Sequence, residues 1–229
     1  VDTTLIAGTR CHGIDVSDAD QLTKGEFEGR EQVRKICDLL RNNFEGGKHI
    51  SISALPAYIG GRESRHLCSL YQLKGEDLLS GRPFHDAIAY GTYPTDIHFA
   101  HEGGIELRYL DGSYIRIVNG KSETGKWREV KGVAPTYYQI PFRSLTPKYL
   151  PNVLVAGRNL DADALAFGAV RVMVNCNQMG EAAGVGAFLA LSNNIAVQKI
   201  DSQDLIKKLQ HGGSLLKTPI ANKELLPME

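Results

Sequence analysis

Apolar positions along the chain follow two periods, one typical of helices and one typical of strands. A helical stripe follows the capping-box spacing of residues 23–26 and consists of Val33, Ile36, Cys37 and Leu40. The glycines and asparagines at 42–47 end it. This stripe predicts a helix that packs on a sheet, with binding of a partner helix as the alternative.

Strand patterns follow this helix. Alternation over 49–55, ended by Pro56, predicts one strand, and 66–73 is expected to form a second. The clearest hairpin runs over 104–118, with a two-residue Asp-Gly turn at 111–112. A second turn is expected at 119–120, followed by a short strand around Trp127.

The stretch from 151 to 194 organises the rest of the chain. Residues 152–156 form an unbroken apolar run that predicts a buried strand, and Gly157 ends it. A polar loop over 158–163 leads to a predicted helix from 168 to 191. This order leaves free N–H groups and a positive dipole end at the helix start, which suits an electron-rich ligand.

The C-terminal part predicts a short edge over 195–200 and then a helix. Asp201 and Ser202 cap this helix, its apolar stripe includes Leu205 and Leu209, and the glycines at 212–213 end it. Together the patterns predict an α+β chain with a mixed-sheet domain and a strand–loop–helix segment.

Composition narrows the function classes. The chain has 229 residues, and 26 Lys and Arg balance 26 Asp and Glu, so we expect neither nucleic acid nor a membrane as partner. No apolar run reaches the roughly 18 residues of a membrane span. The four cysteines lie apart without a C-x-x-C pair, which predicts a cytoplasmic protein without zinc or a disulfide framework.

Several blocks resemble one family. The run NVLVAGRNLDADALAFGAVRVMVNCNQMGEAAGVGAFLAL, over 152–191, is similar to the C-terminal flavin-binding segment of FAD-dependent oxidoreductases of glutathione-reductase-like topology. Three further blocks match the same family: G-G-R-E-S-R at 60–65, the run from Asp86 to His98, and I-P-F-R-S-L at 140–145. The resemblance covers most of residues 25–212 and implies FAD as cofactor.

The resemblance also implies roles for individual residues. The predicted cofactor contacts are Gly157, Arg158, Asn159, Ala166, Gly168, Arg171 and Val172. Arg158, Asn159 and Arg171 would stabilise negative charge on the flavin ring. Predicted substrate contacts are Arg62, Arg65 and Tyr93, because guanidinium groups hold carboxylates. The alternative for Arg62 and Arg65 is an ion pair with Glu63 or Glu76.

Asp96 and His98 are the candidate catalytic residues. Two residues apart in an extended segment, they point to one face, and a carboxylate beside a histidine fixes its tautomer. His98 would take up the proton that an oxidised substrate must lose, with Asp96 supporting it. A purely structural histidine is the alternative. A metal site from His85, Asp86, Asp96, His98, His101 and Glu102 is disfavoured, because the spacing matches no known ligand set.

The dinucleotide fingerprint G-x-G-x-x-G is missing after any predicted strand. We therefore expect a C-terminal part of an FAD-dependent oxidoreductase that transfers a hydride between an organic substrate and flavin, inactive without the missing N-terminal half. Val1 in place of Met suggests a processed product. The expected domains are 1–144 (substrate), 145–194 (flavin-binding) and 195–229 (helix and tail). Exposed apolar faces would favour association with itself or a partner, and a non-catalytic binding module is the alternative function.

Overall fold

The computed structural model describes residues 3–6, 8–99 and 103–216. The chain divides into two compact units at Arg65 and His66, and each is treated separately below. The domain boundaries predicted at 144/145 and 194/195 both fall inside the second unit, and they stay predictions.

The first unit is organised around one long helix, α1 (Ala19–Asn43). The helix begins at Asp18, whose side chain accepts the Gln21 N–H at 2.8 Å, and not at the predicted capping box. Thr23 instead lies inside the helix, where its hydroxyl donates to the Ala19 carbonyl at 2.8 Å. Gly25 and Gly29 are the buried positions of α1, and Ile59 packs close to both because they have no side chain.

The strand predicted over residues 49–55 is wrong. The chain forms a 3₁₀ turn, η1 (Gly47–His49), and then runs extended without a neighbouring strand among the described residues. An alternating pattern forms a strand only where a neighbouring strand supplies backbone hydrogen bonds. No described strand pairs with this segment.

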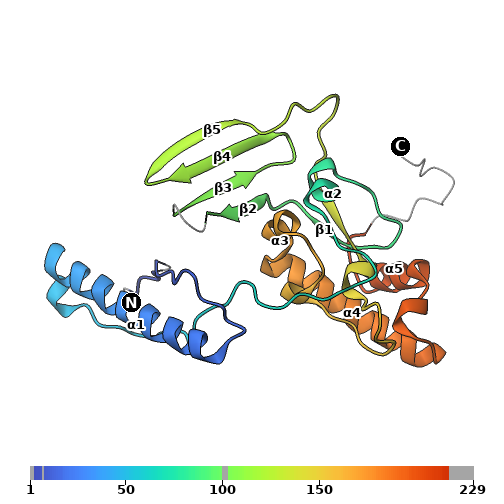
Figure 1. Cartoon of the computed structure of the whole chain (residues 1–229), viewed down its shortest axis with the longest axis horizontal. Coiled ribbons are helices and arrows are strands. Elements are labelled where there is room, and N and C mark those ends of the chain that lie inside the picture. The colour runs from blue at the N-terminus through green and yellow to red at the C-terminus, as the bar shows by residue number, and fades with distance from the viewer. Residues whose placement is uncertain (1–2, 7, 100–102, 217–229) are drawn as a thin grey trace. The chain divides into compact units, whose positions relative to one another are not determined.

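The second unit contains two antiparallel sheets (Figure 1). One pairs β1 (Ala87–Gly91) with β6 (Tyr138–Pro141). The other has the order β2-β3-β4-β5, formed by β2 (Thr95–His98), β3 (Gly104–Arg108), β4 (Ser113–Val118) and β5 (Lys121–Lys126). The predicted hairpin and the turn at 119–120 are confirmed. The two-residue Asp-Gly turn is corrected to a three-residue loop over 110–112, because the Tyr109 N–H donates to the Ser113 carbonyl at 2.9 Å and the Gly112 N–H to the Tyr109 carbonyl at 3.1 Å. The strand predicted around Trp127 is wrong, because the fourth strand is the polar run before it and the Trp127 indole donates to the Tyr109 carbonyl at 3.0 Å.

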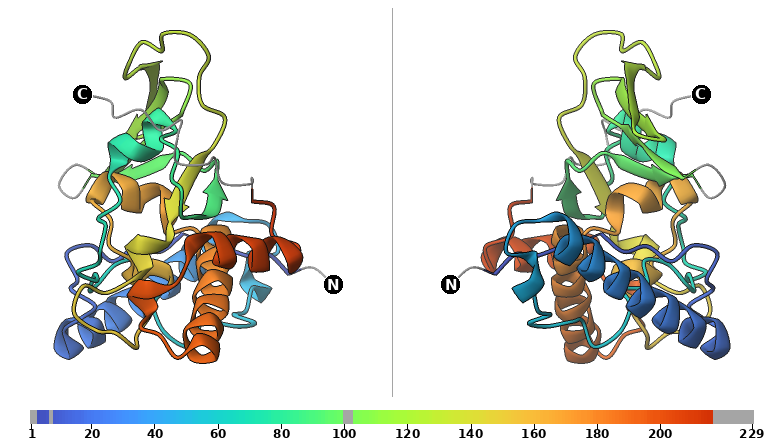
Figure 2. Two further views of the ribbon diagram at one scale, coloured as in Figure 1. Left: turned by 90° about the vertical axis from the view of Figure 1, so that its right-hand side faces the viewer. Right: turned by 90° about the vertical axis from the view of Figure 1, so that its left-hand side faces the viewer.

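Helices pack around these sheets. They are α2 (Gly75–Ser80), α3 (Ala164–Val170), α4 (Met173–Asn193) and α5 (Ser202–His211), with 3₁₀ turns η2 (Phe142–Leu145), η3 (Gly157–Asn159) and η4 (Val197–Lys199). α4 lies against β1 and against α5 (Figure 2). The predicted α5 and its Asp201 cap are confirmed. The edge predicted over 195–200 is wrong, since η4 occupies it.

Two predictions for the organising stretch are also corrected. Residues 152–156 are extended but form no strand, because only the Val155 N–H bonds across to the Leu145 carbonyl, at 2.9 Å, and the segment is half-buried. The expected helix is two helices, because Arg171 and Val172 interrupt it. Residues 66–73 likewise form only two isolated bridges, Ser69 with Pro147 and Leu73 with Ala162.

The core of the second unit lies where β1, β6 and helices α3–α5 meet. Fully buried residues here include Ile140, Leu145, Val170, Met179, Leu205 and Leu209. Gly186 of α4 has no side chain, so Phe142 and Leu154 pack close to the helix at this position. Gly180 and Gly184, by contrast, face open space. The α+β class is confirmed, with antiparallel sheets.

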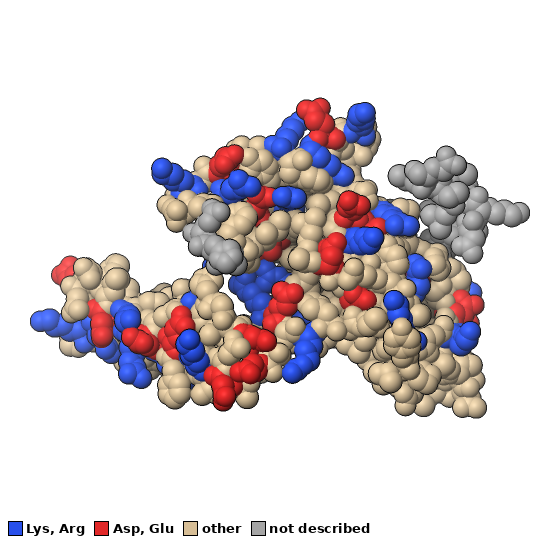
Figure 3. All heavy atoms as spheres, viewed as in Figure 1, with Lys and Arg blue, Asp and Glu red and all other residues tan. Residues whose placement is uncertain are grey.

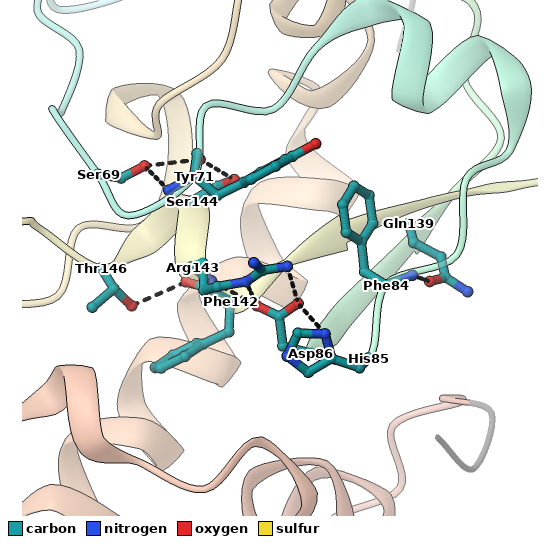
Figure 4. Close-up of polar contacts among 10 residues, drawn as sticks. All are labelled: Ser69, Tyr71, Phe84, His85, Asp86, Gln139, Phe142, Arg143, Ser144 and Thr146. Carbon is teal, nitrogen blue, oxygen red and sulfur yellow. Dashed lines mark hydrogen bonds and ion pairs between the residues drawn. The ribbon is translucent and has the colours of Figure 1, made fainter. Parts of the chain in front are cut away.

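Asp86 joins β1 to η2 in this core (Figure 4). Its buried carboxylate binds the Arg143 guanidinium at 2.9 and 3.1 Å and accepts the Arg143 backbone N–H at 3.1 Å. Both carboxylate oxygens of Asp86 therefore bond to Arg143 and have a structural role. Over the described residues no group of three or more ligating side chains could hold a metal, and His101 and Glu102 lie outside the described residues.

The surface carries both signs of charge. Basic and acidic side chains are interspersed over the face that Figure 3 presents. In the part of the chain that the structure describes, no helix has the length and apolar character needed to cross a bilayer.

Candidate functional site

The site is built around the contact between α3 and β2. A Cβ atom added to Gly168 of α3 would lie 2.8 Å from the carbonyl oxygen of Asp96 and 3.1 Å from its nitrogen. Only glycine allows the helix to approach the strand backbone this closely. The contact brings residues more than 70 positions apart in sequence next to each other.

Asp163 fixes the start of α3. Its carboxylate accepts the Ala166 N–H at 2.7 Å as a helix cap, and it also accepts the N–H of Gly75, the first residue of α2, at 3.0 Å. One side chain therefore ties α2 and α3 together. Because α3 has only seven residues, its start also determines where Arg171 lies at its end.

Arg171, Asp96 and His98 form a connected cluster. The Arg171 guanidinium lies 2.9 Å from the Asp96 carboxylate, and Nε2 of His98 lies 3.2 Å from the same carboxylate. The side chains of Arg171, Asp96 and His98 are 11%, 14% and 27% exposed, so the cluster is largely shielded but His98 reaches the surface. The predicted pairing of Asp96 with His98 on one face is confirmed, and the bond from Arg171 was not predicted.

The cluster fixes the tautomer of His98. A carboxylate only accepts hydrogen bonds, so Nε2 must carry the hydrogen that it shares with Asp96. The lone pair of the neutral ring then lies on Nδ1. Arg171 holds the Asp96 carboxylate in position through its contact at 2.9 Å.

A second set of groups lies at the junction of α3 and α4. Nε of Arg158 in η3 donates to the Arg171 carbonyl at 3.3 Å. Gly157, which starts η3, has a φ of +82° and nothing within 4 Å of its Cβ position. This positive φ favours glycine, and the space beside it is open.

The start of α4 has no side-chain cap. Val172 precedes the helix with φ −70° and ψ 150°, and its apolar side chain cannot cap the helix. Its carbonyl accepts the N–H groups of Asn175 and Cys176, but those of Met173 and Val174 have no acceptor among the described residues. Both residues are exposed. A helix of 21 residues therefore presents its positive end and two N–H groups to the outside.

Asn175, in the first turn of α4, connects the helix to neighbouring elements. Its buried amide nitrogen donates to the Tyr138 hydroxyl at 2.9 Å and to the Ala169 carbonyl at 3.2 Å. Burial raises the pKa of Tyr138 to about 12, so the hydroxyl stays neutral and donates to the same carbonyl. This network ties the start of α4 to Tyr138 of β6.

The predicted site residues do not all lie together. Gly168 and Arg171 come together with Asp96 and His98, and Arg158 joins them through the Arg171 carbonyl. Val172 follows Arg171 and precedes α4. Ala166 is fully buried, and the Asn159 carbonyl accepts the Leu67 N–H at 2.9 Å. Tyr93, 40% exposed, precedes β2.

Arg62 and Arg65 belong to the first unit, where the Arg65 guanidinium donates to the Ser17 carbonyl at 3.2 Å. Their predicted role toward substrate stays a prediction. Sequence reasoning missed Asp163, although an aspartate three residues before Ala166 is a capping signal.

The family model for FAD dependent oxidoreductase matches residues 2–211. No curated protein and no solved structure matched the chain. The match spans more than half of the chain, so the chain belongs to the FAD-dependent oxidoreductase family, whose cofactor is FAD.

Proposed function

We propose that this chain provides the substrate side and the flavin edge of an enzyme that moves a hydride between an organic substrate and FAD. Bound FAD supplies the hydride acceptor. The observation that carries the proposal is the Arg171–Asp96–His98 cluster beside the uncapped start of α4. It supports a proton acceptor at His98 whose partner Asp96 is held by Arg171, two residues before the α4 helix end that attracts negative charge.

The residues at the α3–α4 junction fit the electron-rich edge of the flavin ring. The N–H groups of Met173 and Val174 have no acceptor among the described residues, and the helix dipole adds positive potential there. The open space beside Gly157 leaves room for a planar group to approach the backbone. Arg158 would add a further positive charge.

His98 would accept the proton that the substrate must lose. When a hydride leaves a carbon for FAD, the hydroxyl or amine on that carbon releases a proton, and Nδ1 of His98 takes it. Asp96 holds the ring through Nε2 and stabilises the charge that the ring gains. Arg171 keeps the carboxylate in place, so the ring does not need to reorient.

The ADP end of FAD would be held by residues outside this sequence, because no G-x-G-x-x-G fingerprint follows a strand within it. The exposed apolar residues of α4 support such a covering part: Met173, Val174, Phe188 and Leu191 are 75%, 65%, 57% and 83% exposed. A surface of this kind favours burial against another domain or a second copy.

The test is reduction of the flavin by substrate in the FAD-loaded protein. His98→Ala should lower the rate of flavin reduction by about 10²–10⁴-fold while FAD content is unchanged. The matched control is His85→Ala, which removes another part-exposed histidine beside a carboxylate and should leave the rate within about twofold. Equal rates for wild type and His98→Ala would remove the assignment. Failure of the wild type to bind FAD even with the N-terminal half restored would favour a non-catalytic module.

A further inference from the structure

The four-stranded sheet has two chemically different faces. On one face the buried carboxylate of Glu106 binds Arg108 at 2.7 Å and Arg116 at 2.6 Å, so its charges are paired. Arg116 also lies over the rings of Phe99 and Tyr114. The charged groups of this face are therefore paired with each other.

Register determines what lies on the other face. Residues directly opposite each other in an antiparallel sheet share a face and lie about 5 Å apart. Asp96 pairs with Leu107, and Leu107 with Ile115; His98 pairs with Ile105, and Ile105 with Ile117. The two rows therefore each begin with a residue of the candidate site and continue with two aliphatic residues.

These four aliphatic residues, Ile105, Leu107, Ile115 and Ile117, are named the aliphatic wall. Each is only partly buried, and Ile117 is 38% exposed. Beyond them both rows end in the small polar side chains of Ser122 and Thr124 on β5. Across β3 and β4, both fully described, this face carries no charged side chain. Lys126, opposite Ser113, lies at its far corner.

We propose that the aliphatic wall binds an apolar, uncharged part of the substrate, continuous with the carbon that reacts beside His98. This inference rests on the proposed function and gives it a substrate class: a hydroxyl or amine group at one end and an aliphatic or aromatic portion extending over two strands. Strand spacing sets the length of that portion at about 10 Å from the His98 ring. A carboxylate in the same place would lose its hydration without gaining a cationic partner from the wall.

The aliphatic wall is continuous with the candidate site, and this position indicates that the substrate covers it. The wall and the cluster belong to the same two rows, so a molecule that presents its reacting group to His98 must cover Ile105 or Leu107. An aliphatic chain gains from burying these side chains, and the gain grows with each methylene group. The wall is therefore a specificity element, and Asp96 and His98 determine where the reactive end lies.

The test uses straight-chain 1-alkanols from propanol to octanol as probes. Methyl resonances of isoleucine and leucine in the FAD-loaded protein are followed by NMR during titration. Shifts should concentrate on the aliphatic wall, and affinity should rise about two- to fourfold per methylene group until the wall is covered. Hexanoate should bind at least about tenfold more weakly than hexanol.

Two neighbouring substitutions provide the matched comparison. Ile117→Asn should remove most of the dependence on chain length, whereas Val118→Asn, on the same strand but the opposite face, should keep it. The proposal is overturned if the alkanols leave the wall methyls unshifted, if hexanoate binds as tightly as hexanol, or if both variants behave alike. Because methyl shifts do not depend on flavin reduction, a wall that binds alkanols in a protein whose flavin is never reduced would refute the proposed function alone.

Discussion

Gly168→Ala tests the contact on which the site depends. The added methyl group would lie 2.8 Å from the Asp96 carbonyl oxygen and 3.1 Å from its nitrogen, and both are backbone atoms that cannot rotate away. Overpacking of this kind costs about 1–3 kcal/mol. Alanine is favoured over glycine inside a helix by roughly 0.5–1 kcal/mol, so we expect a net loss of about 0–2.5 kcal/mol in the free energy of unfolding.

Gly184→Ala is the matched control, because Gly184 lies inside α4 with nothing within 4 Å of its Cβ position. This substitution should raise the free energy of unfolding by about 0.5–1 kcal/mol. Urea unfolding of wild type and both variants measures the difference, which should be about 1–3 kcal/mol between the variants. If Gly168→Ala stabilises the chain as much as Gly184→Ala does, α3 and β2 are not in close contact.

The shift of α3 caused by Gly168→Ala should also affect the rate of flavin reduction. Arg171 lies three residues after Gly168 and bonds to Asp96 at 2.9 Å, so a shift of α3 of a few tenths of an ångström lengthens that bond. In the FAD-loaded protein we expect flavin reduction to slow about tenfold or more, with FAD content retained. An unchanged reduction rate would show that Arg171 does not position Asp96.

Three further predictions concern the surroundings of the site. Asp163→Ala should cost about 1–2 kcal/mol in urea unfolding, and Asp163→Asn, which keeps a capping oxygen, should recover most of it; an equal loss in both would contradict the capping role. Burial acts to raise the pKa of Glu106, but Arg108 and Arg116 outweigh it and lower the pKa. Its stabilisation is therefore complete above the unfolded pKa of about 4.3 and is lost as pH falls through the lower folded value. Glu106→Gln should then cost about 1–2 kcal/mol at pH 7, reduced because both arginines are part-exposed, and clearly less at about pH 3; a cost independent of pH would refute this. Burial raises the pKa of the Cys176 thiol, so iodoacetamide at pH 8 should alkylate the exposed Cys68 first, and mass spectrometry showing the reverse order would contradict it.

Local signals in the sequence predicted some elements well. Gly112 and the Asn-Gly turn at 119–120 define the two hairpins because they adopt positive φ, and Asp201 marks the start of α5 through its side chain. β5 was missed because its run K-S-E-T-G-K has no apolar alternation; it pairs through backbone bonds to β4.

Other features depend on contacts that no local pattern records. An apolar run such as 152–156 becomes a strand only where a neighbouring strand accepts it. The bond between Arg171 and Asp96 joins positions 75 residues apart, so sequence reasoning predicted both residues for the site but not their contact. The resemblance to the family indicated Arg171 and Asp96 as site residues, and the close approach of α3 to β2 at Gly168 explains why their side chains are in contact.

The start of α4 provides the most direct test of a flavin edge at the α3–α4 junction. Proline at the first helical position is tolerated, and the φ and ψ of Val172 suit a residue before proline, so Met173→Pro should remove one outward N–H group without loss of stability. The measurement is the dissociation constant of FAD, from quenching of flavin fluorescence on binding to the apoprotein that includes the N-terminal half. The account predicts binding about 5- to 30-fold weaker than in wild type with an unchanged free energy of unfolding. The same dissociation constant for both proteins would contradict it.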